Sequence, residues 1–333
     1  MKLEEFNYNL PPELIAQEPK EQRDESRLMV VQDKDIQHRI FKDILNYLEK
    51  GDVLVLNETK VEPVKLKGKK ATGAAAEFII SKKLAQKRFL CQITSNKVRK
   101  GNVFEFDKDL KATVIGDSDG FEFEVEFNKD NVEQILQDIG EMPLPPYIKK
   151  QAKRQQYQTV FAKNKGSIAA PTAGFHFTPE LLRDIEAKGI KIVKITLHVS
   201  YGTFLPVKTE DIEDHRMHEE WFEISGSAAK AINERHGRLI VVGTTSLRAL
   251  ESAADNMGIV QPKQDSTEIF IYPGYKFRLR PDMMITNFHL PKSTLLMLIA
   301  ALIGLDNVKH AYETAVKEKY RFYSFGDAML LIT

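Results

Sequence analysis

The sequence has a single cysteine, no excess of either charge and no long apolar run, and each of these absences excludes a class of protein. The lone Cys91 excludes disulfides and cysteine-based zinc sites. Lys and Arg number 48 against 47 Asp and Glu, so any contact with RNA must use a local patch rather than overall charge. The longest apolar run, 295–303, is far shorter than the roughly 20 residues that a membrane span requires.

The N-terminus agrees with this reading, because its acidic start, Met1-Lys-Leu-Glu-Glu, does not resemble a signal peptide. We therefore expect a soluble, cytoplasmic protein that has no membrane segment. Its 333 residues allow a large core and suggest two domains.

The residues that are present follow two different patterns along the chain. Outside 64–148, apolar strands alternate with helical segments, which is typical of an α/β fold. Within 64–148, short alternating strands follow one another between turn residues, which favours a small barrel or sandwich. We predict an α/β main domain formed by 1–63 and 149–333, with 64–148 inserted as a small β domain.

The expected elements can be placed along the chain. In the main domain they are strands at 28–31, 53–56, 190–199, 239–242, 268–271 and near Met284, and helices at 41–49, 227–235, 246–255 and 307–319, with further helices beginning at Pro179 and Pro291. In the insertion they are strands at 77–80, 88–93, 103–106, 112–115 and 121–127.

Three polar turns each lead into a helix start: 169–177, 243–246 and 286–293. A helix start offers unpaired N–H groups that attract anions. The third helix is apolar all round and should be buried, with Gly304 placed to end it. We predict that the three turns converge on one pocket. Its candidate binding residues are Thr172, Gly174, Gly243, Thr244, Thr245, Ser246, Arg248, Asn287, His289, Lys292 and Ser293, joined by Asn57, Thr59 and Lys60 from a fourth polar turn.

Five of the eight histidines lie in polar, turn-rich segments of the second half: His176, His198, His215, His218 and His289. Any one of them could be structural, but together they favour acid–base chemistry.

The pair His215 and His218, followed by Glu220, admits three interpretations: a metal site, an acid–base or substrate contact, or a structural role. A spacing of three would place both rings on one face of a helix. This is a weak pattern beside the stricter zinc signatures, so we predict no metal.

Three further segments each have two interpretations. Gly202 and Thr203 follow a strand, where the backbone can approach a ligand closely or simply turn. The aromatic residues of 320–325 around Arg321 either belong to the core or stack against bases, and Asp327 after them is a candidate carboxylate for binding a base or a substrate cation.

The run 65–100 holds 11 Lys or Arg against one acid, and Lys149, Lys150, Lys153 and Arg154 extend its basic character. That run is a solvated face or an RNA contact.

In their order and number, motifs along nearly the whole chain resemble the S-adenosylmethionine:tRNA ribosyltransferase-isomerase family of queuosine biosynthesis. The motifs are 14–17, 26–28, 51–60, 140–148, 157–160, 169–178, 197–204, 211–224, 243–252, 271–277, 285–298 and 320–329.

This resemblance implies an α/β domain that carries an inserted small β-barrel, and it implies a transferase and isomerase that modifies tRNA. The ribosyl group of S-adenosylmethionine would be transferred and rearranged onto 7-aminomethyl-7-deazaguanine at the wobble position of a tRNA with a queuosine-type anticodon. Epoxyqueuosine-tRNA would form, and adenine and methionine would leave. S-adenosylmethionine is then a co-substrate, no prosthetic group is expected, and we favour a monomer.

The reaction requires a base to remove a proton beside the sulfonium, and histidine suits such a transfer near neutral pH. We predict that His215 or His218, oriented by Glu220, moves this proton, with His176 or His198 near the adenine. The helix starts, with Arg248 and Lys292, would hold the methionine carboxylate or an RNA phosphate, and Asp327 the methionine ammonium.

Two alternatives remain at this point. A non-catalytic tRNA-binding module would need the basic β domain but not the histidine-rich turns. A phosphate-handling or methyl-transferring enzyme would use the 243–246 turn.

Overall fold

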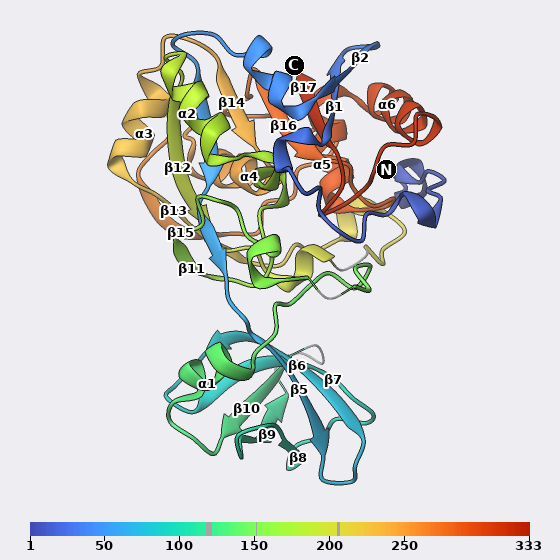
Figure 1. Ribbon diagram of the computed structural model, residues 1–333, viewed down its shortest axis with the longest axis vertical. Helices are drawn as coiled ribbons and strands as arrows, with labels where there is room; N and C mark the ends of the chain where they lie inside the picture. The colour runs from blue at the N-terminus through green and yellow to red at the C-terminus, as the bar shows by residue number, and fades with distance from the viewer. Residues whose placement is uncertain (118–121, 151, 205–206) are drawn as a thin grey trace. The chain divides into compact units, whose positions relative to one another are not determined.

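The computed structural model describes residues 1–117, 122–150, 152–204 and 207–333 (Figure 1). The chain divides into two compact units, the larger formed by Met1–Lys60 with Pro145–Thr333 and the smaller by Val61–Leu144. We call them the larger unit and the barrel unit. The sequence placed the two boundaries at 63/64 and 148/149, whereas this division falls at 60/61 and 144/145.

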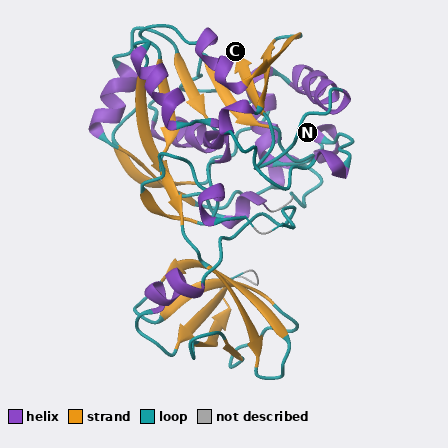
Figure 2. Ribbon diagram, viewed as in Figure 1, coloured by secondary structure: helices purple, strands orange, loops and turns teal. Residues whose placement is uncertain are grey.

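The larger unit is built on one nine-stranded sheet (Figure 2). In spatial order its strands are β15 (Lys263–Thr267), β13 (Glu220–Ile224), β12 (Lys191–Leu197), β3 (Val53–Asn57), β14 (Leu239–Val242), β16 (Met283–Asn287), β17 (Ala328–Ile332), β1 (Arg27–Gln32) and β2 (Asp35–Ile40). A separate two-stranded sheet pairs β4 (Thr59–Val61) with β11 (Asn164–Ser167).

The centre of the sheet is parallel: β12, β3, β14 and β16 run in one direction. Every residue of β3, β14 and β16 is buried, as expected for strands covered on both faces, whose sequences are continuous apolar runs.

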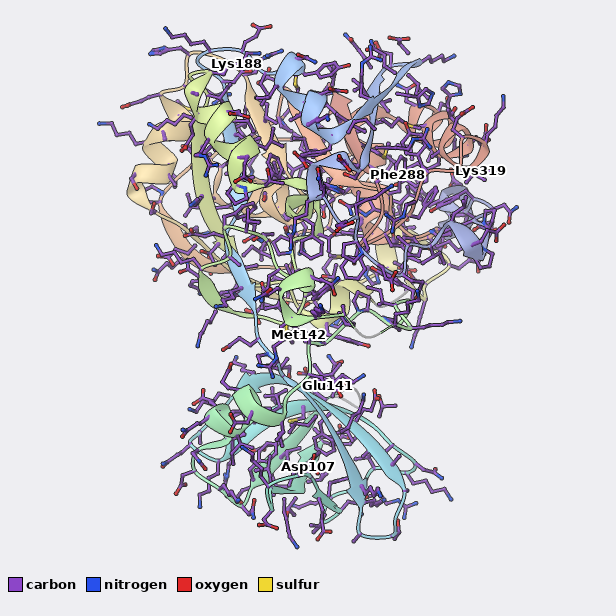
Figure 3. All side chains as sticks on the ribbon, viewed as in Figure 1. Asp107, Glu141, Met142, Lys188, Phe288 and Lys319 are labelled. Carbon is purple, nitrogen blue, oxygen red and sulfur yellow. The ribbon has the colours of Figure 1, made fainter. Side chains whose placement is uncertain are left out.

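Helices cover both faces of the sheet. They are α2 (Pro179–Ala187), α3 (Gly226–Asn233), α4 (Thr244–Ala253), α5 (Thr294–Ile303) and α6 (Leu305–Lys317). On one face Val55 and Val241 pack with side chains of α3, α4, α5 and α6. On the other face Leu54 and Ile240 pack with α2 and a 3₁₀ helix, so alternate residues of each strand serve two cores. Phe288 lies inside this unit, whereas Lys188 and Lys319 project from it (Figure 3).

Short 3₁₀ helices join many of these elements. They are η1 (Leu3–Phe6), η2 (Pro12–Leu14), η3 (Arg23–Glu25), η4 (Phe41–Tyr47), η5 (Arg154–Tyr157), η6 (Thr172–His176), η7 (Tyr201–Phe204) and η8 (Ile212–Asp214). The expected helix at 41–49 is η4, a 3₁₀ rather than an α-helix.

The strand order places a ligand site at one edge of the parallel strands. The chain leaves β3 and returns as β12 on one side of it and as β14 on the other. Ligands of open α/β sheets bind outside the carboxyl ends of the strands where the order reverses. Asn57, Leu197, Val242 and Asn287 end the four strands at this edge.

The barrel unit is a closed, six-stranded antiparallel barrel with strand order β10-β7-β6-β5-β8-β9. Its strands are β5 (Lys65–Lys70), β6 (Ala75–Lys83), β7 (Arg88–Thr94), β8 (Val103–Glu105), β9 (Lys111–Asp117) and β10 (Phe123–Phe127), followed by α1 (Val132–Ile139). The α/β fold with an inserted small β-barrel is therefore confirmed.

Side chains fill the barrel. Phe78 packs edge-on against Phe104 and Phe106 at 5.0 Å between ring centroids, and α1 contributes Ile135 and Leu136 to the same core. Cys91 is fully buried there, and burial raises the pKa of its thiol, so it is inert packing material.

Several expected elements differ from those observed. The strand expected at 268–271 is wrong, because β15 ends at Thr267. The strands β2, β4, β5, β11, β13 and β17 were not expected. The strand β5 is hidden by its lysines, since only Leu66 is buried in Lys65–Lys70. Phe121, the first residue of one expected strand, lies outside the described residues.

The most apolar helix, α5, is packed into the core as expected and ends at Gly304. Its start was placed wrongly: Pro291 precedes the helix, which begins at Thr294. Within the described ranges no single helix is long and apolar enough to cross a membrane, and α5 and α6 pass that test only as a pair bent by 117°.

Candidate active site

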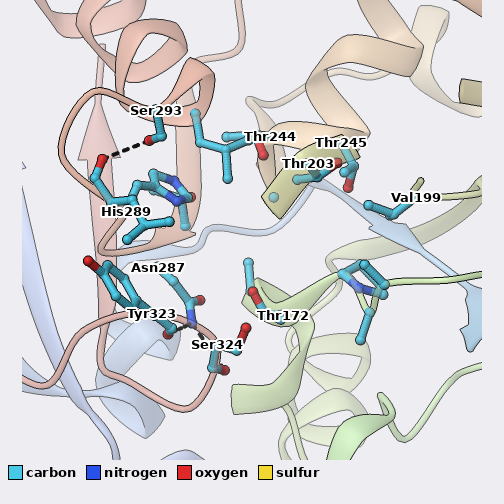
Figure 4. Close-up of a pocket in the computed structure, with 18 of the residues that line it drawn as sticks. Thr172, Val199, Thr203, Thr244, Thr245, Asn287, His289, Ser293, Tyr323 and Ser324 are labelled. Atoms are coloured by element: carbon cyan, nitrogen blue, oxygen red, sulfur yellow. Dashed lines mark hydrogen bonds between the residues drawn. The ribbon is translucent and has the colours of Figure 1, made fainter. Parts of the chain in front are cut away.

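The three predicted turns line one pocket of about 70 Å³ at the carboxyl edge of the sheet (Figure 4). Asn287, His289, Tyr323 and Ser324 form one side of it, and Thr172, Thr203, Thr244 and Thr245 face them. The lining consists of Tyr147, Ala169, Ala170, Pro171, Thr172, Ala173, Val199, Thr203, Gly243, Thr244, Thr245, Thr286, Asn287, Phe288, His289, Leu290, Ser293, Leu295, Tyr323 and Ser324. These residues carry hydroxyls, an amide and one imidazole, but no Lys, Arg, Asp or Glu.

The second turn opens a helix start directly into this pocket. Gly243 has a φ of +87°, which favours glycine, and its N–H donates to Ile285 O at 2.8 Å. It has no side chain with which to cap α4, so the first amides of the helix remain for a ligand. Thr244 and Thr245 line the pocket, whereas Ser246 donates back to Val242 O at 2.6 Å and does not.

The third turn joins β16 to α5. Ser293 lines the pocket and caps α5, accepting from Leu296 N at 3.2 Å. Lys292 does not line it. Its ammonium pairs with Glu4 at 2.5 Å, so its predicted role in holding an anion has no support from its position.

His289 is the single histidine of the lining, and it is buried. Its Nε2 lies 2.8 Å from Thr286 Oγ1, and its backbone N–H donates to Tyr312 OH at 2.9 Å. Burial lowers the pKa of His289 to about 3. The imidazole is therefore neutral near pH 7.

His176 lies behind the pocket wall, held by two hydrogen bonds. Asn287 donates its amide to Tyr323 O at 2.9 Å, which leaves its Oδ1 to accept from His176 Nε2 at 3.2 Å. Nδ1 of His176 then accepts from the Ser26 hydroxyl at 2.6 Å, and the ring stacks on Phe41. Burial lowers the pKa of His176 to about 4, so this network fixes a neutral ring.

A second, smaller pocket of about 20 Å³ adjoins the first through Ser324, which lines both. His176 lies in its wall together with Arg23 and Gln156.

Two tyrosines form an aromatic wall in the first pocket: Tyr147, which sequence reasoning did not select, and Tyr323, one of the aromatics of 320–325. The rings of Tyr147 and Tyr323 lie 4.6 Å apart, and Tyr147 OH is 2.7 Å from Ser324 Oγ. Tyr323 has a φ of +71°, which costs energy for a side chain of this size. The run of aromatics around Arg321 was a signal for Tyr323, but it did not distinguish the pocket residue from its core neighbours.

Glu220 and Arg248 form a buried ion pair. The carboxylate also accepts from Ser200 N at 2.9 Å and from Thr203 Oγ1 at 3.1 Å. These contacts give no support to the prediction that Glu220 orients His215 or His218. Because Thr203 lines the pocket, the pair fixes one side of it.

His215 and His218 do not line the pocket, and residues 215–219 have no regular secondary structure, so the expected shared helix face is wrong. His215 meets the edge of Phe270, and its pKa is lowered by burial and then by His218. His218 is exposed and lies over Gly202, where an added Cβ would meet its ring at 2.2 Å.

His198 lines neither of these pockets, although its neighbour Val199 lines the first. It is stacked on Trp221 at 4.9 Å, and its Nδ1 is 2.7 Å from Thr59 Oγ1. Its predicted place near the adenine has no support from this position.

The remaining candidates have structural surroundings. Asn57 bridges to both N–H and C=O of Leu197, Gly174 packs on Phe161 and Thr159, and Lys60 lies in β4. Asp327 accepts from the backbone N–H groups of Arg27 and Arg321, and burial raises its pKa. Neither Asp327 nor Arg321 lines a pocket, so the predicted ammonium contact is unsupported.

The first pocket therefore offers two helix starts, an aromatic wall and a neutral imidazole. In the described part of the chain, no group of three or more His, Cys, Asp or Glu is arranged to hold a metal ion.

Comparison of the chain with known proteins identifies the family to which it belongs. Residues 3–331 match the model of the family described as queuosine biosynthesis protein. The S-adenosylmethionine:tRNA ribosyltransferase-isomerase of Pelotomaculum thermopropionicum is 51% identical over 342 residues, and that of Desulforamulus reducens is 49% identical over 343, each covering 100% of both chains.

A solved structure is also similar to this chain. The crystal structure of S-adenosylmethionine tRNA ribosyltransferase from Thermotoga maritima has a TM-score of 0.55 at 37% identity, covering 98% of this chain and 100% of that one. The chain belongs to the S-adenosylmethionine:tRNA ribosyltransferase-isomerase family of queuosine biosynthesis.

Proposed function

We propose that this chain transfers the ribosyl group of S-adenosylmethionine to 7-aminomethyl-7-deazaguanine at the wobble position of tRNA and isomerises it, giving epoxyqueuosine-tRNA, adenine and methionine. The observation that carries this proposal is the end-to-end identity of about half of all residues with enzymes of that name. A non-catalytic tRNA-binding module is not favoured, because these relatives are named as enzymes.

The first pocket is the proposed site for S-adenosylmethionine. Its sulfonium carries a positive charge, and the lining contains no Lys or Arg to repel it. The starts of α4 and α5 face the same space and favour the methionine carboxylate, with Thr244 and Thr245 as hydroxyl partners.

The aromatic wall is the proposed support for a planar base. Tyr147 and Tyr323 present rings at the pocket, and a base or a cation gains from contact with an aromatic face. Asn287 holds the carbonyl of Tyr323, so the strained backbone of this residue is fixed before any ligand binds.

His289 is the proposed proton acceptor, in place of His215 and His218. Its imidazole is the one within the lining, and its neutral state leaves a nitrogen free of a proton. A base this weak requires a strongly acidified substrate, which the adjacent sulfonium supplies.

The test is to incubate the protein with tRNA carrying 7-aminomethyl-7-deazaguanine and with S-adenosylmethionine. Free adenine and the mass of the modified nucleoside are then measured. One adenine released per epoxyqueuosine formed is the expected result. A methylated nucleoside, or tRNA binding without adenine release, would overturn the proposal.

A further inference from the structure

The longest stretch of the larger unit without a carboxylate borders the active-site pocket. Residues 142–179 contain no Asp or Glu, although the whole chain has 47. The same stretch contains six cations: Lys149, Lys150, Lys153, Arg154, Lys163 and Lys165. We call the described residues of 149–165, namely 149–150 and 152–165, the basic segment.

The cations of the basic segment are exposed, and three of them are unpaired. Lys149, Lys153 and Lys163 form no ion pair with any residue in the described ranges. Lys150 pairs with Glu18 at 3.0 Å, with both side chains about 60% exposed. Exposed lysines with no carboxylate partner are available to pair with an external anion.

The cations of the barrel unit differ in their surroundings, because they lie among carboxylates of the same unit, and five of the 11 in the run 65–100 are paired within it. Lys65 pairs with Glu77, Lys67 with Glu141 (labelled in Figure 3), Lys83 with Glu133, Lys87 with Asp130 and Arg88 with Glu126. The run 65–100, which looked strongly basic in the sequence, is therefore partly neutralised by acids from 101–141.

The backbone of the basic segment is anchored to the larger unit. Tyr157 is fully buried between Phe175 and Phe325, and the Arg23 guanidinium donates to Gln155 O at 2.9 Å and Gln158 O at 2.7 Å. The anchor fixes where η5 presents Lys153 and Arg154.

The basic segment also leads directly into the site. Tyr147 just before it lines the first pocket, Gln156 within it lines the second, and Ala169–Ala173 after it line the first again. A polyanion bound along the basic segment would therefore contact chain that is continuous with the linings of both pockets.

We propose that the basic segment is the principal contact for the sugar–phosphate backbone of the RNA substrate, with Lys149, Lys153 and Lys163 as phosphate partners. This inference rests on the proposed function, since it assumes that the substrate is a tRNA. Phosphate contacts by lysine give affinity that falls steeply with salt and carries no sequence information.

The test compares two triple variants of equal charge. One is Lys149→Gln, Lys153→Gln and Lys163→Gln. The matched control is Lys82→Gln, Lys97→Gln and Lys100→Gln, three exposed barrel lysines that form no ion pair with a described residue. Binding of a tRNA transcript is measured by fluorescence anisotropy over a range of salt concentrations, and binding of S-adenosylmethionine by calorimetry.

The basic-segment variant should weaken tRNA binding by about tenfold or more and reduce the slope of log K against log salt by roughly one per lysine. Its affinity for S-adenosylmethionine should be unchanged, which also shows that it folds. The barrel variant should bind tRNA within about twofold of wild type, because its lysines lie in a unit whose carboxylates are as numerous as its cations. An unaffected basic-segment variant, or an equal loss in the barrel variant, would overturn the inference. Failure of the wild type itself to bind tRNA would instead count against the proposed function.

Discussion

The two units of this protein bury different kinds of side chain. Among the described residues, the barrel unit buries no charged or strongly polar side chain, and its core is built from phenylalanines and aliphatic residues around Cys91. The larger unit buries His176, Glu220, Arg248, Asn287 and His289 near one edge of its sheet. Burying polar groups is costly unless each is paired, so their concentration marks where the fold supports chemistry.

The stability of the larger unit can be followed separately, because the fluorescent residues of the chain all lie in that unit. Its single tryptophan and all ten tyrosines lie outside 61–144. Tryptophan and tyrosine fluorescence therefore follow the larger unit alone, while far-ultraviolet circular dichroism follows both.

The largest effect is expected at the buried histidine of the pocket. His289→Gln keeps a donor or acceptor near Thr286 but cannot take up a proton, so kcat should fall on the order of 10²- to 10⁴-fold. Adenine release measures it. His218→Ala, an exposed control outside the lining, should stay within a few-fold of wild type. The reverse ranking would return the proton transfer to His218.

Breaking the buried ion pair should cost the most stability. Arg248→Ala leaves the Glu220 carboxylate buried without its cation, so the free energy of unfolding should fall by about 3–5 kcal/mol. Urea denaturation followed by Trp221 fluorescence measures this. A loss below about 1 kcal/mol would mean that water reaches Glu220 and that the pair is not a buried one.

Mild acid should destabilise the larger unit alone. The folded pKa values of His176 and His289 are depressed by burial to about 4 and about 3, so the unfolded chain binds more protons below its usual histidine pKa. The two neutral rings contribute fully to the free energy of unfolding above about pH 6.5. This contribution is lost as the pH falls toward 4, and for His176 the loss amounts to about 3 kcal/mol. The barrel unit has no histidine. Urea unfolding at several pH values tests this, and His176→Gln should flatten the dependence.

A smaller effect is expected at the aromatic wall. Tyr323→Leu removes one ring from beside Tyr147 without adding charge, and aromatic contacts contribute about 0.5–1.5 kcal/mol. KM for S-adenosylmethionine should rise by roughly two- to tenfold while kcat changes less. An unchanged KM would show that neither base nor sulfonium touches this wall.

The smallest effect is expected at a barrel ion pair. Lys67 and Glu141 meet at 2.8 Å with half-exposed side chains, so Lys67→Ala should change the free energy of unfolding by less than about 1 kcal/mol. Chemical denaturation followed by circular dichroism measures it. A loss comparable to that of Arg248→Ala would erase the contrast between the two units.

The parts of the site that sequence could predict are those specified by local patterns. Gly243 follows four apolar residues and precedes a helix, and His289 lies between a buried strand and the most apolar helix, so both were located from their neighbours. Gly304, which ends α5, is equally local.

The parts that sequence missed depend on partners far along the chain. Glu220 meets Arg248 across two elements, so the histidines near it in the sequence did not indicate this pairing. Tyr147 faces Tyr323 only because the chain returns from the barrel unit to this edge of the sheet. The charge of 65–100 looked free because its carboxylate partners lie later in the sequence.

The two outer strands of the nine-stranded sheet limit what else the protein can pair with. Strand β2 is Asp-Ile-Gln-His-Arg-Ile, and β15 is Lys-Gln-Asp-Ser-Thr with an ion pair between Lys263 and Asp265. A foreign strand docking on either border would have to strip water from these charges. The closed barrel has no border at all. Once folded, both units thus resist the stacking of chains into fibrils.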